Sequence, residues 1–361
     1  MDVYLNSIRT AVILFPLLAI ILTIPYLIYN YRKYGSVSYI RSFILFTFYF
    51  YLLCAFFLVI LPLPDKQPII QNRSAFIQLI PFNFIIDFFK ETVLNIREPL
   101  TYISALKQNV FLQPIFNIVL TIPFGMYIAY YFDLHLKKTM MFTFFLSLFF
   151  EITQITGIYG LYSQPYRLFD VDDLFLNTLG GIFGYGLMYY IKRIVPSKHS
   201  LDQKSFKKSV KVSYTRRILA YIIDWAIISI ISFIINQLLS WDKDYIFNLI
   251  FFLYFIGSTV ITDGRTIGKS LVRLHIICKN TNQSRFLSFC LRYFLLWLWI
   301  HNTDLLLIIP LNNSPILFLI LSLFIYTLIV WDLIYSTMHD KELFYERVSK
   351  TKNESVLIIN K

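Results

Sequence analysis

Polar side chains interrupt two apolar stretches of this chain, and their spacing would let them act together. Ser147, Glu151 and Gln154 are spaced i, i+4, i+7, so in a helix they share one face. A glutamate inside an apolar span costs about 2.5 kcal/mol or more on insertion scales and needs a partner. Arg167 and the amide of Asn177 are the nearest candidates in sequence. We therefore expect two helices that present polar faces to each other.

The second stretch repeats this spacing and follows an acidic run. Asp173, Asn177, Gly180 and Gly184 would share one face of its helix, and the glycines favour close packing against another helix. A guanidinium in such a cluster could hold a phosphate bidentately, and carboxylates could hold an amine or a divalent cation. The alternatives are ion pairs that only tie helix ends together, or a catalytic carboxylate. The expected members of this acidic cluster are Asn117, Glu151, Gln154, Arg167, Asp170, Asp172, Asp173 and Asn177.

The composition is that of a membrane protein. Hydrophobic residues make up 57% and charged residues 15% of the chain, and the mean hydropathy is +0.62, whereas soluble domains carry about 25% charged residues. A helix needs about 20 apolar residues to cross a bilayer. The sequence predicts an all-α, polytopic integral membrane protein with about nine transmembrane helices, at about residues 8–29, 42–64, 114–132, 139–158, 173–191, 218–240, 245–262, 287–309 and 315–335.

Lysine and arginine orient these helices, because cytoplasmic loops carry an excess of both. If successive helices cross the membrane in opposite directions, the basic loops, including 192–217 and 263–285, all lie on one side of the membrane. This predicts an outside N-terminus, an inside C-terminus and an acidic cluster near the outer leaflet of the cell (plasma) membrane. The net charge of +12 then indicates attraction to anionic lipids rather than to nucleic acid.

A polar, basic stretch divides the chain. Residues 196–213 lack apolar periodicity and have the composition of a cytoplasmic linker. We expect a membrane domain of about five transmembrane helices at 1–195 and one of about four at 214–361, with a cytoplasmic tail. In the long loop before the third expected span, 84–94 has a helical pattern typical of an interfacial helix or a re-entrant segment.

Several stretches of the first half resemble the VanZ-like family of bacterial membrane proteins. They cover roughly residues 40–195 and are Ile80-Pro81-Phe82, Asn117 through Pro123-Phe124-Gly125, Ser147-x3-Glu151-x2-Gln154 and Arg167-Leu-Phe-Asp170-Val-Asp172-Asp173-x3-Asn177-x2-Gly180-Gly181. The founding member of that family is associated with resistance to teicoplanin, a lipid-tailed glycopeptide, and no chemistry is established for the family at large. The predicted topology adds an expectation about partners. Because the acidic cluster would lie near the outer leaflet, we expect a membrane lipid, a lipid-linked cell-wall precursor or a lipoglycopeptide as partner.

The second half resembles the RDD family, named for its Arg, Asp and Asp positions. The resemblance covers roughly residues 212–352 and rests on Tyr214-x-Arg216-Arg217-x2-Ala220-x3-Asp224, Thr266-x-Gly268-Lys269 and His339-Asp340. The sequence departs from the family after Asp340, where Lys341-Glu-Leu-Phe-Tyr-Glu-Arg-Val-Ser-Lys replaces a small Ala-Gly-Thr turn. For some members the family implies transport or sodium/proton exchange. The expected inner cluster is Arg217, Asp224, Lys269, Asp332 and Asp340.

The inner cluster has two readings. Asp224 and Asp332 lie inside apolar stretches and need a partner, which Arg217 or Arg292 could supply. Such acids are either proton or cation carriers or structural ion pairs. Lys269 is expected on a basic rim with its neighbours Arg265 and Arg273.

The outer placement of the acidic cluster favours a non-enzymatic envelope protein that binds a lipid-linked headgroup or a lipoglycopeptide and contributes to resistance of the teicoplanin type. No catalytic residue or cofactor is expected, and no metal, because histidines and cysteines have no metal-ligand spacing. Two alternatives stay open. One is a small cation- or proton-coupled transporter that uses the inner acids. The other is an intramembrane lipid-phosphate enzyme with Glu151 as acid or base. Oligomeric state does not follow from the sequence.

Overall fold

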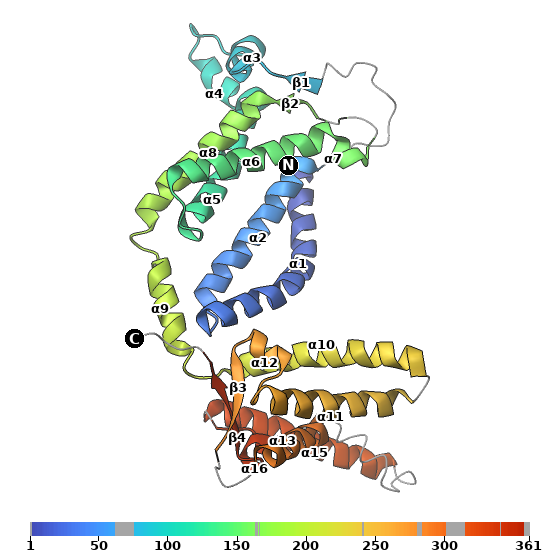
Figure 1. Ribbon diagram of the computed structural model, residues 1–361. Coiled ribbons are helices and arrows are strands. Elements are labelled where there is room, and N and C mark those ends of the chain that lie inside the picture. The colour runs from blue at the N-terminus through green and yellow to red at the C-terminus, as the bar shows by residue number, and fades with distance from the viewer. Residues whose placement is uncertain are drawn as a thin grey trace. The chain divides into compact units, whose positions relative to one another are not determined.

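The protein is helical almost throughout (Figure 1). The structure, a computed structural model, describes residues 2–61, 76–162, 165, 167–239, 242–279, 284–300, 315–339 and 341–356. It forms two compact units, one of Met1–Thr23 with Ser38–Asp202 and one of Ile24–Val37 with Gln203–Lys361. The first helix, α1 (Asp2–Tyr34), contributes to both units.

The first unit is built around three long helices, α5 (Asn109–Tyr130), α6 (Leu136–Ile155) and α8 (Val171–Ile191), which pack against one another (Figure 1). Strand β1 (Ile77–Gln78) pairs in parallel with β2 (Phe169–Asp170) just before α8 begins. The remaining helices that begin in this unit are α2 (Tyr39–Ile60), α3 (Asn83–Glu91), α4 (Leu100–Leu106), α7 (Gly157–Gly160) and α9 (Lys198–Lys208). The expected interfacial segment is thus helical as α3, and the expected linker contains α9.

Glycines bring the backbone of α8 against α5 and α6. A Cβ added at Gly184 would overlap the carbonyl oxygen of Ile122 on α5, and one at Gly181 would overlap the hydroxyl of Thr143 on α6. At Gly180 it would overlap the carbonyl oxygen of Ile118. Only glycine allows backbones to approach so closely. The close packing predicted for Gly180 and Gly184 is confirmed.

The second unit contains four long helices, α10 (Tyr214–Leu239), α11 (Lys243–Ile261), α13 (Arg285–Ile300) and α15 (Pro315–Met338), and the short helices α12 (Ile267–Leu271) and α16 (Phe344–Val348). The unit also contains two antiparallel strands that were not predicted from the sequence, β3 (Leu274–Cys278) and β4 (Thr351–Ser355). Aliphatic and aromatic side chains form its core, where Phe255 stacks on Tyr293 with 4.7 Å between ring centroids. The chain's C-terminal part is therefore folded into this unit at least as far as β4.

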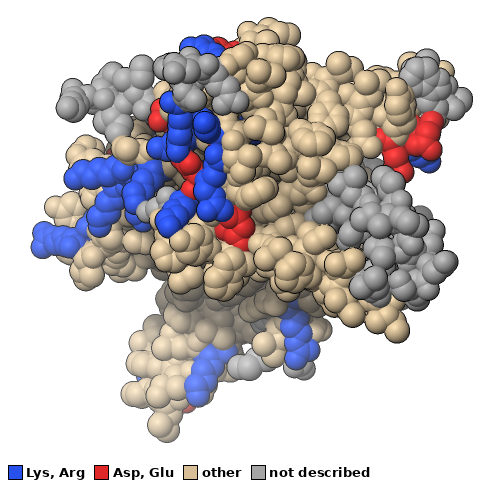
Figure 2. Space-filling view, turned by 90° about the horizontal axis from the view of Figure 1, so that it is seen from below, with Lys and Arg blue, Asp and Glu red and all other residues tan. Residues whose placement is uncertain are grey.

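The all-α membrane class is confirmed. Each of the nine expected stretches coincides with a helix, and seven of the described helices are long and apolar enough to cross a membrane. The other two are α6, which carries Lys137, Lys138 and Glu151, and α13, which is 16 residues long. The end of the expected 287–309 helix lies outside the described residues. Figure 2 shows a mostly uncharged face on which Lys and Arg side chains gather to one side.

The glycine contacts of α8 generate a matched pair of variants. Gly184→Ala should destabilise the protein by about 1–3 kcal/mol, the usual effect of overpacking. Gly186, two residues on in α8, has nothing within 4 Å of its added Cβ, so Gly186→Ala should be neutral or slightly stabilising. Thermal unfolding of both variants in detergent checks this. Equal melting temperatures would show that the close contact does not constrain α8.

Candidate functional site

The acidic cluster surrounds a cavity of about 780 Å³ in the first unit. Seven of its eight expected residues line this cavity: Asn117, Glu151, Gln154, Arg167, Asp170, Asp173 and Asn177. The rest of the lining is mainly apolar and comes from α2, α5 and α6, with Leu58, Leu112, Phe116, Leu120 and Phe150 among it. This space, which we call the acidic cavity, is therefore lined by both polar and apolar side chains.

The eighth residue, Asp172, does not line the cavity and instead binds backbone N–H groups beside the start of α8. Its carboxylate accepts hydrogen bonds from the backbone N–H groups of Phe82, at 2.6 Å, and Phe84, at 3.0 Å. Phe82 has a left-handed backbone (φ 64°), a conformation uncommon for a non-glycine residue. Asp170 caps the helix by accepting from the N–H of Asp172 at 2.9 Å. The Ile80-Pro81-Phe82 stretch is thus fixed to the start of α8.

Glu151 has a different partner from the two expected in sequence. It is buried, and its Oε2 accepts a hydrogen bond from the backbone N–H of Asp170 at 3.0 Å. The amide of Asn177 donates to the hydroxyl of Ser147 at 2.8 Å, so its expected contact with Glu151 is wrong. Glu151 therefore ties α6 to the residue that caps α8. A backbone N–H group could not be predicted as the partner from the pattern of side chains.

Hydrogen bonds link the helices around the acidic cavity to one another. Asn117 donates to the carboxylate of Asp173, and Thr121, which the sequence analysis missed, donates to the carbonyl of Asn177 at 2.7 Å. Gln154 donates to the carbonyl of Val59 at 3.0 Å. Among the described residues the buried Oδ1 of Asn177 has no hydrogen-bond partner. A ligand with a donor could satisfy this acceptor.

The lining of the acidic cavity carries a net negative charge. Three carboxylates, those of Glu151, Asp170 and Asp173, line it with one guanidinium, that of the exposed Arg167. Partial burial raises the pKa of the Asp170 carboxyl above its usual value, and the nearby carboxylates of Asp172 and Asp87 add to this. No ion pair of Arg167 exists within the described part of the chain. The alternative in which Arg167 only pairs with the acids is therefore not what the described residues do.

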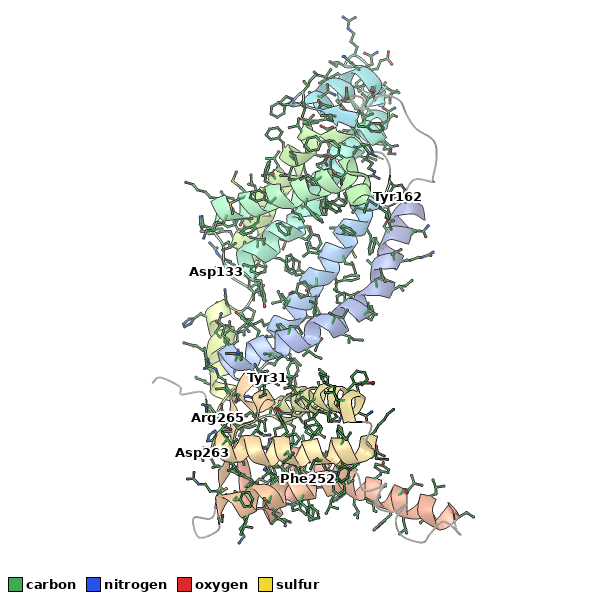
Figure 3. All side chains as sticks on the ribbon, turned by 45° about the vertical axis from the view of Figure 1, so that its right-hand side comes forward. Tyr31, Asp133, Tyr162, Phe252, Asp263 and Arg265 are labelled. Carbon is green, nitrogen blue, oxygen red and sulfur yellow. The ribbon has the colours of Figure 1, made fainter. Side chains whose placement is uncertain are left out.

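The second unit contains a cavity of about 540 Å³, which we call the basic cavity. Its lining is largely apolar, from α10, α13 and α15, but it includes the cationic side chains of Arg217, Lys269 and Arg292. Of the expected inner cluster, Arg217 and Lys269 meet here. Lys269 is buried, so its expected place on a basic rim is wrong, whereas Arg265 is exposed and lies with Asp263 at the turn after α11 (Figure 3).

Asp224 binds the Thr266–Lys269 segment rather than an arginine. Its carboxylate accepts from the hydroxyl of Tyr254 at 2.6 Å, from the hydroxyl of Thr266 and from the backbone N–H of Gly268 at 2.7 Å. The expected pairing with Arg217 or Arg292 is wrong. Thr266 caps α12, and its loop reaches the carboxylate because Gly268 packs directly on α10.

Both arginines instead meet Glu346, which the sequence analysis missed. Arg217 Nη1 lies 2.8 Å from Glu346 Oε2, and Arg292 Nη2 lies 3.0 Å from Oε1. Asn353 and the N–H of Leu343 also donate to this fully buried carboxylate. The one sequence feature that pointed to Glu346 was the departure from the family pattern after Asp340.

The remaining members of the inner cluster lie elsewhere. Asp332 pairs with Arg347 at 2.6 Å and accepts from the N–H of Phe344 at 2.8 Å, so its expected partner, Arg217 or Arg292, is also wrong. Asp340 lies outside the described residues. Arg216, the neighbour of Arg217, is fully buried and donates to the carbonyls of Gly35, Val272 and Arg273. It therefore secures the end of α1 and β3.

Fold and cavities together define a polytopic helical membrane protein in which charged side chains line two largely apolar cavities. The family model described as VanZ/LLP1 matches residues 48–193, and the one described as RDD family matches residues 211–342. The chain is therefore a VanZ-like region followed by an RDD region, as the two resemblances predicted. Neither the comparison with curated proteins nor that with solved structures finds a significant match.

The buried centre at Glu346 generates a stability prediction. Glu346→Gln should cost about 3–5 kcal/mol, because it leaves two buried guanidinium groups without their counter-charge. Asp263→Asn is the matched control, since its ion pair with Arg285 is exposed and should contribute no more than about 1 kcal/mol. Denaturant unfolding in detergent measures both. A Glu346→Gln variant as stable as Asp263→Asn would contradict a central role for this carboxylate.

The same centre generates a pH dependence. Burial alone raises the pKa of Glu346, but Arg292 and Arg217 outweigh burial, so this pKa lies below its usual value. The carboxylate therefore stabilises the folded state above the unfolded pKa of about 4.3, and this contribution is lost as the pH falls through the lower folded pKa. Melting temperature should drop in this acidic range in the unaltered chain, and less in Glu346→Gln. Parallel curves for the two proteins would contradict the assignment.

Proposed function

We propose that the acidic cavity binds the polar head of an amphiphile at the outer leaflet of the plasma membrane, either a lipid-linked cell-wall precursor or a lipoglycopeptide. Through this binding the protein lowers sensitivity to antibiotics of the teicoplanin type. The observation that carries the proposal is the mixed lining of the cavity. Carboxylates and amides line it together with aliphatic and aromatic side chains of α2, α5 and α6. Such a lining suits a ligand with a polar head and a lipid tail.

The polar groups indicate the chemistry of the head. The carboxylates of Glu151 and Asp173 and the unpartnered Oδ1 of Asn177 are all acceptors, so they favour an amine. Among the described residues no group of three His, Cys, Asp or Glu side chains could hold a metal ion, which favours an organic ammonium group. Arg167, exposed beside them, would hold a phosphate or carboxylate of the same ligand.

The alternative functions find less support. For an acid or base at Glu151, one carboxyl oxygen, Oε2, is already held by the N–H of Asp170, so only Oε1 is left to face a substrate. A transporter would use Asp224 as a coupling acid, but three hydrogen bonds already engage that carboxylate. We therefore assign Asp224 a structural role. The VanZ-like region, whose family resemblance implies teicoplanin resistance, contains the acidic cavity.

The proposal predicts a drug-specific phenotype. Deletion of the gene should lower tolerance of teicoplanin, which has a lipid tail, and leave tolerance of non-lipidated vancomycin unchanged. The unaltered gene should restore tolerance, whereas Glu151→Gln and Arg167→Ala should not, because each removes a charge from the cavity lining. Minimal inhibitory concentrations at equal membrane expression measure this.

A matched control is Asp133→Asn, which removes an exposed carboxylate at the end of α5 that pairs with Lys192 and does not line the cavity (Figure 3). This variant should restore tolerance fully. The proposal fails if deletion alters neither drug response. It also fails if the two cavity variants complement as well as Asp133→Asn.

A further inference from the structure

The basic cavity of the RDD region holds a buried cation that its surroundings do not neutralise. Lys269 is 8% exposed. Its ammonium has one hydrogen-bond partner among the described residues, the hydroxyl of Tyr293 at the long distance of 3.4 Å. The rings of Phe255 and Tyr293 lie 5.8 and 5.7 Å from Nζ. An ammonium has three donors, so most of its hydrogen-bonding capacity is unused.

The neighbouring carboxylates are occupied elsewhere. Glu346 is shared by two guanidinium groups, an amide and a backbone N–H, and Asp224 accepts from two hydroxyls and a backbone N–H. The charged groups that face Lys269 are therefore Arg217, Arg292, Glu346 and Asp224. With Lys269 itself these are three cations and two anions, which leaves one positive charge without a counter-ion.

Further donors at the cavity also lack partners. The Nε groups of Arg217 and Arg292 are buried and form no hydrogen bond within the described residues. Burial lowers the pKa of Lys269 to about 8, although Asp224 attracts its charge. A buried charge without a partner is costly, so these groups together favour the entry of an anion.

The rest of the cavity favours an apolar body behind that anion. Its lining includes Leu274, Leu296, Leu333 and Tyr345, and the largely exposed side chains of Ile334 and Met338 lie at its edge on α15. The volume of about 540 Å³ falls within the roughly 300–1,000 Å³ of pockets that hold drug-sized ligands. One acyl chain with a small head suits this space.

We propose that the basic cavity binds an amphiphile whose head carries a single negative charge, with that charge at the Lys269 ammonium and the acyl chain among α10, α13 and α15. A fatty-acid carboxylate and the phosphodiester of an acidic phospholipid share this chemistry. The proposal concerns the RDD region and is independent of the acidic cavity.

The test is photolabelling of the full chain in phosphatidylcholine nanodiscs with a diazirine-bearing palmitate. Labelled peptides should map to α13 or α15, and unlabelled palmitate should compete while hexadecanol, which has the same tail without charge, should not. Phosphatidylglycerol added to the nanodiscs distinguishes the sources. If phosphatidylglycerol competes with the probe, this supports a phosphodiester head. If palmitate competes and phosphatidylglycerol does not, this supports a carboxylate head.

Variants of Lys269 test whether the labelling depends on its ammonium group. Lys269→Met should reduce specific labelling about tenfold, the equivalent of about 1.4 kcal/mol, whereas Lys269→Arg keeps the charge and should retain most of it. Lys243→Met, which removes an exposed lysine at the start of α11, is the control and should label fully. Equal labelling of Lys269→Met and Lys243→Met, or equal competition by palmitate and hexadecanol, overturns the proposal. If Lys269→Met does not fold, the competition series on the unaltered chain and Lys269→Arg decides alone.

Discussion

The need to satisfy charge in apolar surroundings governs both units of this protein. In the second unit a single carboxylate, Glu346, joins α10, α13, α16 and β4, because Arg217, Arg292 and Asn353 all donate to it. Removing one partner of such a centre leaves a buried charge uncompensated, which is more costly than never having placed the pair there. The packing of these elements therefore depends on this carboxylate more than on any one apolar contact.

The VanZ-like region meets the same need with backbone groups. Asp172 accepts from backbone N–H groups at the start of α3 and Glu151 from one in β2, and the strand pair β1–β2 brings these two segments together. Glycines on α8 then let its backbone contact α5 and α6. The carboxylates at the start of α8 are thereby directed to one end of the three-helix packing. The lining of the acidic cavity follows from this arrangement.

Much of this could be predicted from the sequence, because helical spacing and apolar length are local properties. The faces of Ser147, Glu151 and Gln154 and the close contact at Gly184 required only the geometry of one helix. The partners of Glu151 and Asp224 could not be predicted, because they are backbone N–H groups or hydroxyls that the fold brings in from other elements, such as the hydroxyl of Tyr254 on α11. Glu346 was missed for a related reason. It lies in a polar segment after the last span, and contacts between elements far apart in sequence, among them the pairing of β3 with β4 and of Asp332 with Arg347, carry that segment into the core.

The most direct test of the account concerns the side of the membrane on which the acidic cavity opens. A single cysteine in place of the exposed Arg167, with Cys54, Cys278 and Cys290 replaced by serine, can be treated in intact cells with a membrane-impermeant maleimide. The account predicts labelling of this cysteine, while one in place of Lys211, in the basic stretch before α10, reacts only after the cells are lysed. Labelling at Lys211 and protection at Arg167 in intact cells would place the cavity on the cytoplasmic side and contradict the account.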